Sequence, residues 1–134
     1  MELSAAQRER YERNLLVEGF TDRMQQALIA ARVAVVGAGG LGSAALNYLV
    51  AAGVGHLTLI ENDTVSLSNL QRQVLYTTAD MGRPKAEVAA MRLSRLNPGC
   101  NIRVVTDRLT AANAAGLLGG HDAVVDCTDN YDAR

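Results

Sequence analysis

The pattern of polar and apolar positions changes sharply at residue 32. Residues 2–31 are charged and amphipathic, and they predict two short helices. Ser4 caps the first, which ends near Glu12, and Thr21 caps the second, which runs to Ala31. Downstream, short β-branched runs alternate with segments of small apolar residues. This alternation predicts strands at 32–36, 56–60, 102–106 and 123–126, and helices at 40–52, 84–96 and 111–118.

Strands that alternate with helices at this spacing favour right-handed crossovers and a parallel sheet. We therefore expect an α/β fold: a Rossmann-like parallel sheet of about four strands with flanking helices and an N-terminal helical segment. Residues 1–31 are assigned to that segment and residues 32–134 to a nucleotide-binding domain. In residues 62–83, the apolar positions follow neither the period of a helix nor that of a strand. The sequence stops directly after a strand, where another helix would begin, so we expect this domain to be incomplete at its C-terminus.

Composition removes several functional classes. A chain of 134 residues with 49% hydrophobic residues and a net charge of −1 predicts one folded domain, with neither disorder nor the basic face that nucleic acids require. Its apolar runs are far shorter than the ~20 residues that span a bilayer, and residues 1–10 do not resemble a signal peptide. Cys100 and Cys127 form no CxxC pair, so a zinc site is not supported. These features predict a cytoplasmic protein.

Directly after the first strand, residues 37–42 read GAGGLG and open a helix. In a GxGxxG loop, Gly37 makes the tight turn, Gly39 lets the backbone approach a phosphate, and Gly42 lets the helix pack on the strand. Glu61 ends the second strand, where a carboxylate accepts hydrogen bonds from ribose hydroxyls. This set predicts a nucleotide site but favours NAD or FAD as strongly as ATP.

Three charged residues favour group transfer over hydride transfer. Arg72 belongs to a polar stretch after the second strand, Lys85 lies near the start of a helix, and Asp129 follows the fourth strand. Because the fourth strand of a doubly wound sheet returns beside the first, Asp129 is expected near a phosphate on the glycine loop. Lys85 is the only lysine, whereas the other twelve basic residues are arginines. An acid, an arginine and a lysine around phosphates suit phosphoryl or nucleotidyl transfer.

With these motifs in order, the sequence resembles the ThiF/MoeB/HesA family, the prokaryotic relatives of ubiquitin-activating enzymes. The resemblance covers nearly the whole chain. The matching segments are RYERN at 10–14, the loop at 37–42, END at 61–63, SNLQRQ at 68–73, GRPKA at 82–86 and DCTDN at 126–130.

The resemblance implies an enzyme that uses ATP and Mg²⁺ to adenylate the C-terminal glycine carboxylate of a ubiquitin-like sulfur-carrier protein. It also implies a homodimer in which Arg13 reaches the ATP of the partner. The implied catalytic residues are Arg72, Lys85 and Asp129, with Asp129 also linked to magnesium. The implied nucleotide-binding residues are Gly37, Gly39, Gly40, Gly42, Glu61, Asn69 and Asn130.

Some features depart from the family pattern. The family usually has Gln at the position of Asn14 and often Asp at that of Glu61. Its domains are about twice this length, and the later half carries the carrier-protein groove and, in many members, two CxxC zinc pairs. Cys127 matches a core position rather than a nucleophile.

Four hypotheses about the function remain open from the sequence alone. One is the adenylyltransferase, or its ATP-binding fragment, acting in a thiamine or molybdopterin type of pathway. The others are a dinucleotide-dependent oxidoreductase, a non-catalytic nucleotide-binding or dimerisation module, and a tRNA-modifying dehydratase of the same family.

Overall fold

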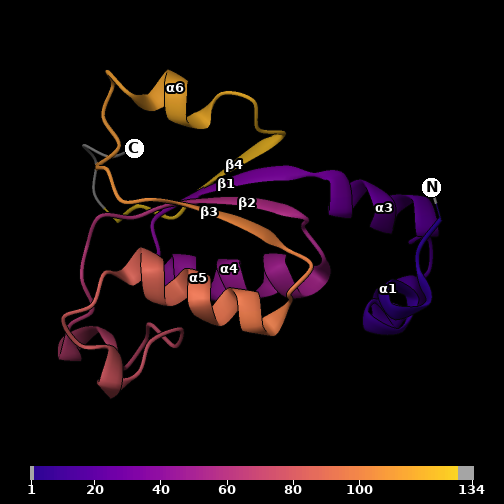
Figure 1. Cartoon of the computed structure of the whole chain (residues 1–134), viewed down its shortest axis with the longest axis horizontal. Helices are drawn as coiled ribbons and strands as arrows, with labels where there is room; N and C mark the ends of the chain where they lie inside the picture. The colour runs from indigo at the N-terminus through magenta and orange to yellow at the C-terminus, as the bar shows by residue number, and fades with distance from the viewer. Residues whose placement is uncertain (1, 130–134) are drawn as a thin grey trace.

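The computed structural model describes residues 2–129, in which four parallel strands form one sheet (Figure 1). The spatial order is β3-β2-β1-β4, so the chain returns after β3 to pair β4 with β1. The predicted Rossmann-like parallel fold is confirmed. The strands are β1 (Arg32–Val36), β2 (His56–Ile60), β3 (Asn101–Val105) and β4 (Ala123–Asp126).

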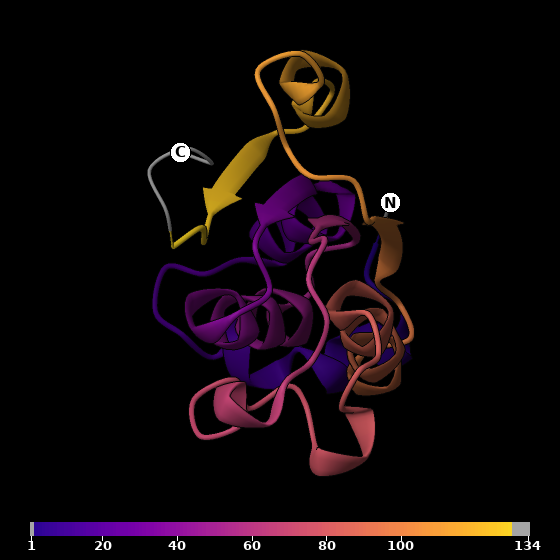
Figure 2. The ribbon, with the colours of Figure 1, turned by 90° about the vertical axis from the view of Figure 1, so that its left-hand side faces the viewer.

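Helices cover both faces of the sheet. On one face, α4 (Gly40–Ala52) and α5 (Lys85–Leu96) bury the main hydrophobic core, to which Val35 and Leu59 belong. On the other face, α6 (Ala114–Leu118) lies over a smaller cluster built on Val36, Ile60 and Val105 (Figure 2). Neighbouring strand residues such as Val35 and Val36 thus point to opposite faces, as the period of two requires.

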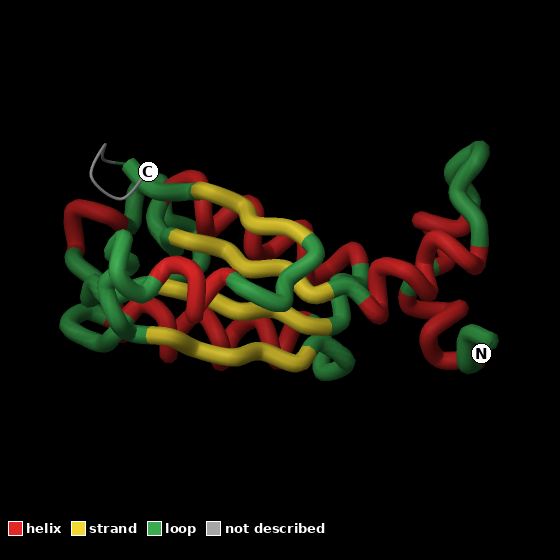
Figure 3. Tube along the Cα trace, turned by 90° about the horizontal axis from the view of Figure 1, so that it is seen from above, coloured by secondary structure: helices red, strands yellow, loops and turns green. Residues whose placement is uncertain are grey.

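The N-terminal helices α1 (Ala5–Arg10), α2 (Glu12–Leu15) and α3 (Asp22–Ala30) lie beyond the amino ends of the strands (Figure 3). Side-chain amides join them to the sheet layer. The amide nitrogens of Asn14 and Gln25 both donate to the Ala52 carbonyl at 3.0 Å, and Asn97 donates to the Tyr11 hydroxyl at 2.8 Å. The division of the chain into 1–31 and 32–134 stays a prediction.

Three predicted elements have boundaries that are wrong by one to three residues. Pro84 keeps an extended backbone, so α5 begins at Lys85. The strand predicted at 102–106 lies one residue earlier, because the Asn101 amide already donates to the Gly55 carbonyl. The helix predicted from residue 111 begins at Ala114, because Asn113 accepts from the Thr110 amide and forms a turn there.

The N-terminal helices also differ in detail from the prediction. Ser4 and Thr21 are the caps, as predicted. The first predicted helix, α1, ends at Arg10, and a further helix that was not predicted, α2, follows Tyr11. The second predicted helix ends at Ala30 rather than Ala31.

The aperiodic segment 62–83 is folded, although it has little regular structure. It contains two single 3₁₀ turns, η1 (Leu67–Asn69) and η2 (Thr78–Asp80). The buried carboxylate of Asp80 holds the second turn, because it accepts from the amide and hydroxyl of Thr77 and pairs with Arg83 and Arg92. In the described residues, no helix is long and apolar enough to cross a membrane.

Candidate nucleotide site

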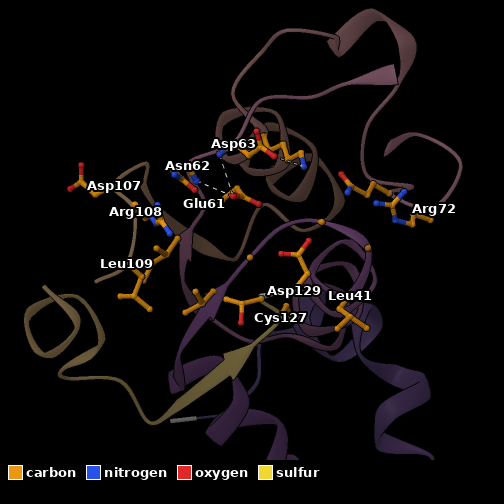
Figure 4. A pocket seen from close by; sticks show the side chains of 18 residues that line it. Leu41, Glu61, Asn62, Asp63, Arg72, Asp107, Arg108, Leu109, Cys127 and Asp129 are labelled. Atoms are coloured by element: carbon orange, nitrogen blue, oxygen red, sulfur yellow. Dashed lines mark hydrogen bonds and ion pairs between the residues drawn. The ribbon is translucent and has the colours of Figure 1, made fainter. Parts of the chain in front are cut away.

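A cavity of about 730 Å³ opens at the carboxyl ends of the strands. It lies where the chain order reverses between β1 and β4, which is the usual ligand position in open α/β sheets. Segments that follow all four strands contribute to its wall (Figure 4). The lining residues are Val36, Gly37, Gly39, Gly40, Leu41, Ile60, Glu61, Asn62, Asp63, Arg72, Gln73, Lys85, Asp107, Arg108, Leu109, Cys127, Thr128 and Asp129.

The glycine loop connects β1 to α4 and has the close contacts that its sequence predicts. Gly37 has a φ of +98°, and a Cβ there would lie 2.7 Å from the Cys127 carbonyl oxygen. A Cβ at Gly42 would overlap the carbonyl oxygen of Gly37. Gly39 caps α4 without any side-chain hydrogen bond, which leaves the first amides of this 13-residue helix at the cavity wall. Free amides at a helix start are suited to bind an anion.

Glu61 accepts three backbone hydrogen bonds. Its Oε1 takes the N–H of Ala38 at 3.0 Å, and its Oε2 takes the N–H groups of Asn62 and Asp63 at 2.9 and 3.2 Å (Figure 4). The carboxylate is therefore fixed in orientation and ties the end of β2 to the glycine loop. Because a carboxylate has about four acceptor positions, it retains capacity for ligand hydroxyls.

Lys85 lies at the first position of α5, and its side chain is almost fully buried in the cavity wall. Its Nζ is 3.3 Å from Oδ2 of Asp63, and the Lys85 amide donates to the Asp63 carbonyl at 3.0 Å. The single lysine of the chain is thus placed at the predicted site, with its ammonium held beside one carboxylate.

Arg72 and Gln73 approach the glycine loop from segment 62–83. The side chain of Arg72 lies 3.7 Å from the position that a Cβ on Gly40 would take. The side-chain amide nitrogen of Gln73 lies 3.2 Å from the position that a Cβ on Gly39 would take. Gln73 is buried, and its Oε1 has no hydrogen-bond partner in the described residues. Because Gly39 and Gly40 have no side chains, Arg72 and Gln73 can lie close to the backbone of the glycine loop.

Asp129 and Cys127 reach the cavity from the end of β4 (Figure 4). Asp129 is exposed and points into the cavity, as the return of β4 beside β1 predicts. Burial, together with the charge of Asp126, raises the pKa of the Cys127 thiol. Cys127 also packs against the main core, so it is a packing residue rather than a reactive thiolate.

Two sequence-predicted side chains lie elsewhere. Asn69 does not line the cavity, and its Oδ1 accepts from the Ser66 hydroxyl at 2.7 Å. Arg13 is exposed on α2, beyond the opposite end of the sheet. Asn130 lies outside the described residues. Within residues 2–129, no three His, Cys, Asp or Glu side chains gather closely enough to hold a metal ion by themselves.

Sequence reasoning missed the segment after β3, where Asp107, Arg108 and Leu109 form one side of the cavity (Figure 4). It also assigned no role to Asp63 or Gln73. The available signal was topological: residues directly after each parallel strand gather at one edge of the sheet. Asp107, Arg108 and Leu109 belong to no glycine or acid pattern, so only that placement could have identified them.

Comparison with known proteins matches residues 11–134 to the ThiF family model. The chain belongs to the ThiF family. A molybdopterin-synthase adenylyltransferase of Salmonella typhimurium is 50% identical over 133 residues, covering 99% of this chain and 53% of that protein. A sulfur carrier protein adenylyltransferase of Thermus thermophilus is 49% identical over 126 residues, covering 94% of this chain and 46% of that protein.

Solved structures of this family agree with the fold. The tRNA N6-threonylcarbamoyladenosine dehydratase TcdA of E. coli, in complex with ATP, superimposes with a TM-score of 0.89 at 35% identity. The match covers 97% of this chain and 53% of that one. The chain thus spans about half the length of the ThiF-family relatives it matches.

Proposed function

We propose that this chain is the ATP-binding part of an adenylyltransferase that activates the C-terminal glycine carboxylate of a ubiquitin-like sulfur-carrier protein. The observation that carries the proposal is the meeting of the glycine loop, Lys85 and Arg72 at one cavity. The names of the family members at 49–50% identity support the same activity. An ATP-dependent step on a small carrier protein also suits the cytoplasmic location expected from the sequence.

The cavity wall fits ATP in its polar and apolar parts. Amides at the start of α4 face the cavity without a side-chain cap, and Lys85 and Arg72 supply positive charge for a triphosphate. Glu61 is oriented to accept from ribose hydroxyls. Ile60 and Leu109 supply the apolar surface that a purine base requires. Hydride transfer with NAD or FAD releases no phosphate, so it needs no cations to offset the charge of a leaving group.

In the proposed reaction, an oxygen of the carrier carboxylate bonds to the α-phosphorus of ATP. The bond from that phosphorus to the bridging oxygen breaks, and pyrophosphate leaves with the bonding electrons. Lys85 and Arg72 offset the negative charge that grows on the leaving phosphates. When bound, Mg²⁺ would supply further charge neutralisation, and Asp129, one of the carboxylates that line the cavity, would hold it. One carboxylate is enough, because Mg²⁺ commonly keeps waters and phosphate oxygens as its other ligands.

We also propose that two copies of the chain associate and that Arg13 acts at the site of the partner. Within one chain, α2 lies at the amino end of the sheet, whereas the cavity lies at the carboxyl end. Arg13 therefore cannot serve the site of its own chain without a large movement. In a dimer, Arg13 of one copy can instead reach the cavity of the other copy.

The activity is tested on the full-length protein by exchange of labelled pyrophosphate into ATP. We expect exchange only when a ubiquitin-like carrier with a free C-terminal glycine is present. A carrier that lacks that glycine is the matched control. Absence of exchange with every carrier, together with intact ATP binding, would support a non-catalytic module instead.

One structural observation favours a second candidate, a tRNA-modifying dehydratase. The fold superimposes on the E. coli tRNA dehydratase over 97% of this chain. The two functions differ in their second substrate. ATP consumption that depends on tRNA and not on a carrier protein would establish the dehydratase and overturn the adenylyltransferase.

A further inference from the structure

One residue of the glycine loop is held on both sides by side chains from other segments. The hydroxyl of Tyr76 donates to the carbonyl of Ala38 at 2.6 Å, and the N–H of Ala38 donates to Glu61 at 3.0 Å. Tyr76 and Ala38 are both buried. The hydroxyl of Ser43 also points to this carbonyl, but at 3.4 Å it is a much weaker donor. Tyr76 is therefore the principal partner of the Ala38 carbonyl.

The turn that carries Tyr76 also carries the other side chains that flank the loop. The amide of Tyr76 donates to the Gln73 carbonyl at 3.2 Å, and the Gln73 side chain lies against Gly39. Arg72, the preceding residue, lies against Gly40. A single hydrogen bond from Tyr76 thus connects this turn to the loop that begins α4.

We propose that Tyr76 is a positioning residue of the nucleotide site, which fixes the Ala38 carbonyl so that the loop at 39–41 and Arg72 keep their places around a bound phosphate. This inference rests on the proposed function. The physical reason is preorganisation: a loop already held in its bound form loses less conformational freedom when the ligand binds. Tyr76 touches the loop and not the reacting atoms, so it acts only through the backbone.

The environment of Tyr76 keeps its hydroxyl protonated, so that the hydroxyl can donate a hydrogen bond. Burial, together with the negative charges of Glu61 and Asp63, raises the pKa of its hydroxyl well above the usual range. The hydroxyl therefore keeps its proton, and its hydrogen bond to Ala38, throughout the range in which ATP binding is measured.

The test compares Tyr76→Phe with Tyr11→Phe. Tyr11 is also buried, and its hydroxyl accepts from Asn97 at 2.8 Å far from the cavity, so its removal matches the loss of a buried hydroxyl. We expect both variants to keep the wild-type circular dichroism and to lower the melting temperature. Only Tyr76→Phe should weaken ATP binding in calorimetry, by about threefold to tenfold, the range for loss of one neutral hydrogen bond. Equal ATP affinity in Tyr76→Phe and wild type would overturn the proposal.

Amide hydrogen exchange without nucleotide separates this inference from the proposed function. We expect the Ala38 amide to be protected in the wild type. Tyr76→Phe should speed exchange at Ala38 by a similar factor, whereas Tyr11→Phe should leave this amide unchanged. Unchanged exchange in Tyr76→Phe, or an unprotected Ala38 amide in the wild type, would overturn the positioning role even if ATP binds. Lack of ATP binding by the wild type, with these exchange changes present, would contradict only the proposed function.

Discussion

The ammonium of Lys85 lies 3.3 Å from the carboxylate of Asp63, and the two side chains differ sharply in exposure. Lys85 is 5% exposed and Asp63 is 67% exposed, so the cation is the buried member of the pair. In the described part of the chain, Asp63 is the only hydrogen-bond acceptor of the Nζ group, which has three donors. Lys85 therefore faces the cavity with donor capacity left for an anion.

This geometry predicts a strict requirement for lysine at position 85. A compact ammonium fits between phosphate oxygens, whereas the planar guanidinium of Lys85→Arg needs more room than a buried wall provides. We expect Lys85→Arg in the full-length protein to keep the fold and much of the ATP affinity, while pyrophosphate exchange falls about a hundredfold or more. Lys85→Ala should lose at least as much.

The matched control is Arg95→Ala, which removes an exposed cation from the last turn of the same helix. It should leave exchange unchanged. Near wild-type exchange by Lys85→Arg would refute a catalytic role for the lysine.

Asp63→Asn removes the charge that balances Lys85. We expect the unfolding free energy of the nucleotide-free chain to fall by about 1 kcal/mol, the upper end for a partly exposed pair. Bound phosphates then become the principal counter-charge of Lys85, so ATP should raise the melting temperature of this variant by more than it raises that of the wild type.

Asp22→Asn is a suitable control, because it breaks the exposed Arg8–Asp22 pair on the N-terminal helices. It should not alter the effect of ATP. A smaller ATP-induced shift in Asp63→Asn than in wild type would mean that Asp63, and not Lys85, is the main contact of the nucleotide.

Two glycines of the loop should respond differently to alanine. A Cβ at Gly42 would overlap the Gly37 carbonyl oxygen, so Gly42→Ala must displace backbone and should unfold readily in urea. A Cβ at Gly39 meets only the end of the Gln73 side chain, so Gly39→Ala should keep the fold and weaken ATP binding. Similar urea midpoints for the two variants would contradict this difference.

Asp80 gives a pH-dependent prediction. Burial acts to raise its pKa, but hydrogen bonds from Thr77 and Arg92 and the charge of Arg92 outweigh that effect, so its pKa is lowered in the folded protein. The contribution of a group with a lowered pKa is present above its unfolded pKa of about 3.9 and is lost as the pH falls through the folded value.

We therefore expect Asp80→Asn to reduce the unfolding free energy by about 2 kcal/mol at pH 7, because charge-assisted hydrogen bonds are lost. Urea denaturation at pH 7 and pH 3 measures this. The difference between variant and wild type should shrink at pH 3. A constant difference at both pH values would contradict the account.

The periodicity of apolar residues along the sequence predicted most of the fold. The limits of β1, α4, β2 and β4 agree with the sequence prediction, because a glycine or a sharp change in polarity marks each end. Boundaries set by tertiary contacts were missed. The end of the extended segment at Pro84 depends on pairing with Thr64, and the start of β3 depends on the Gly55 carbonyl, neither of which is visible locally.

The site was predictable to the extent that it lies in motifs. The glycine loop, Glu61, Lys85 and Asp129 all line the cavity. Side-chain packing in segment 62–83 could not be inferred, since that segment has no period to fix its path. The contact of Tyr76 with Ala38 spans 38 residues and is visible only in the folded chain. The second role of Glu61, as the acceptor for Ala38, likewise depends on the turn of the loop.

The central claim is that this cavity binds the triphosphate of ATP, and calorimetric titration of the chain with ATP–Mg²⁺ and with NAD tests it most directly. We expect saturable binding of ATP–Mg²⁺, weaker binding in Lys85→Ala and Arg72→Ala, and unaltered binding in Arg95→Ala. NAD should bind far more weakly than ATP. Tighter binding of NAD than of ATP, or equal ATP affinity in Lys85→Ala and wild type, would contradict the account.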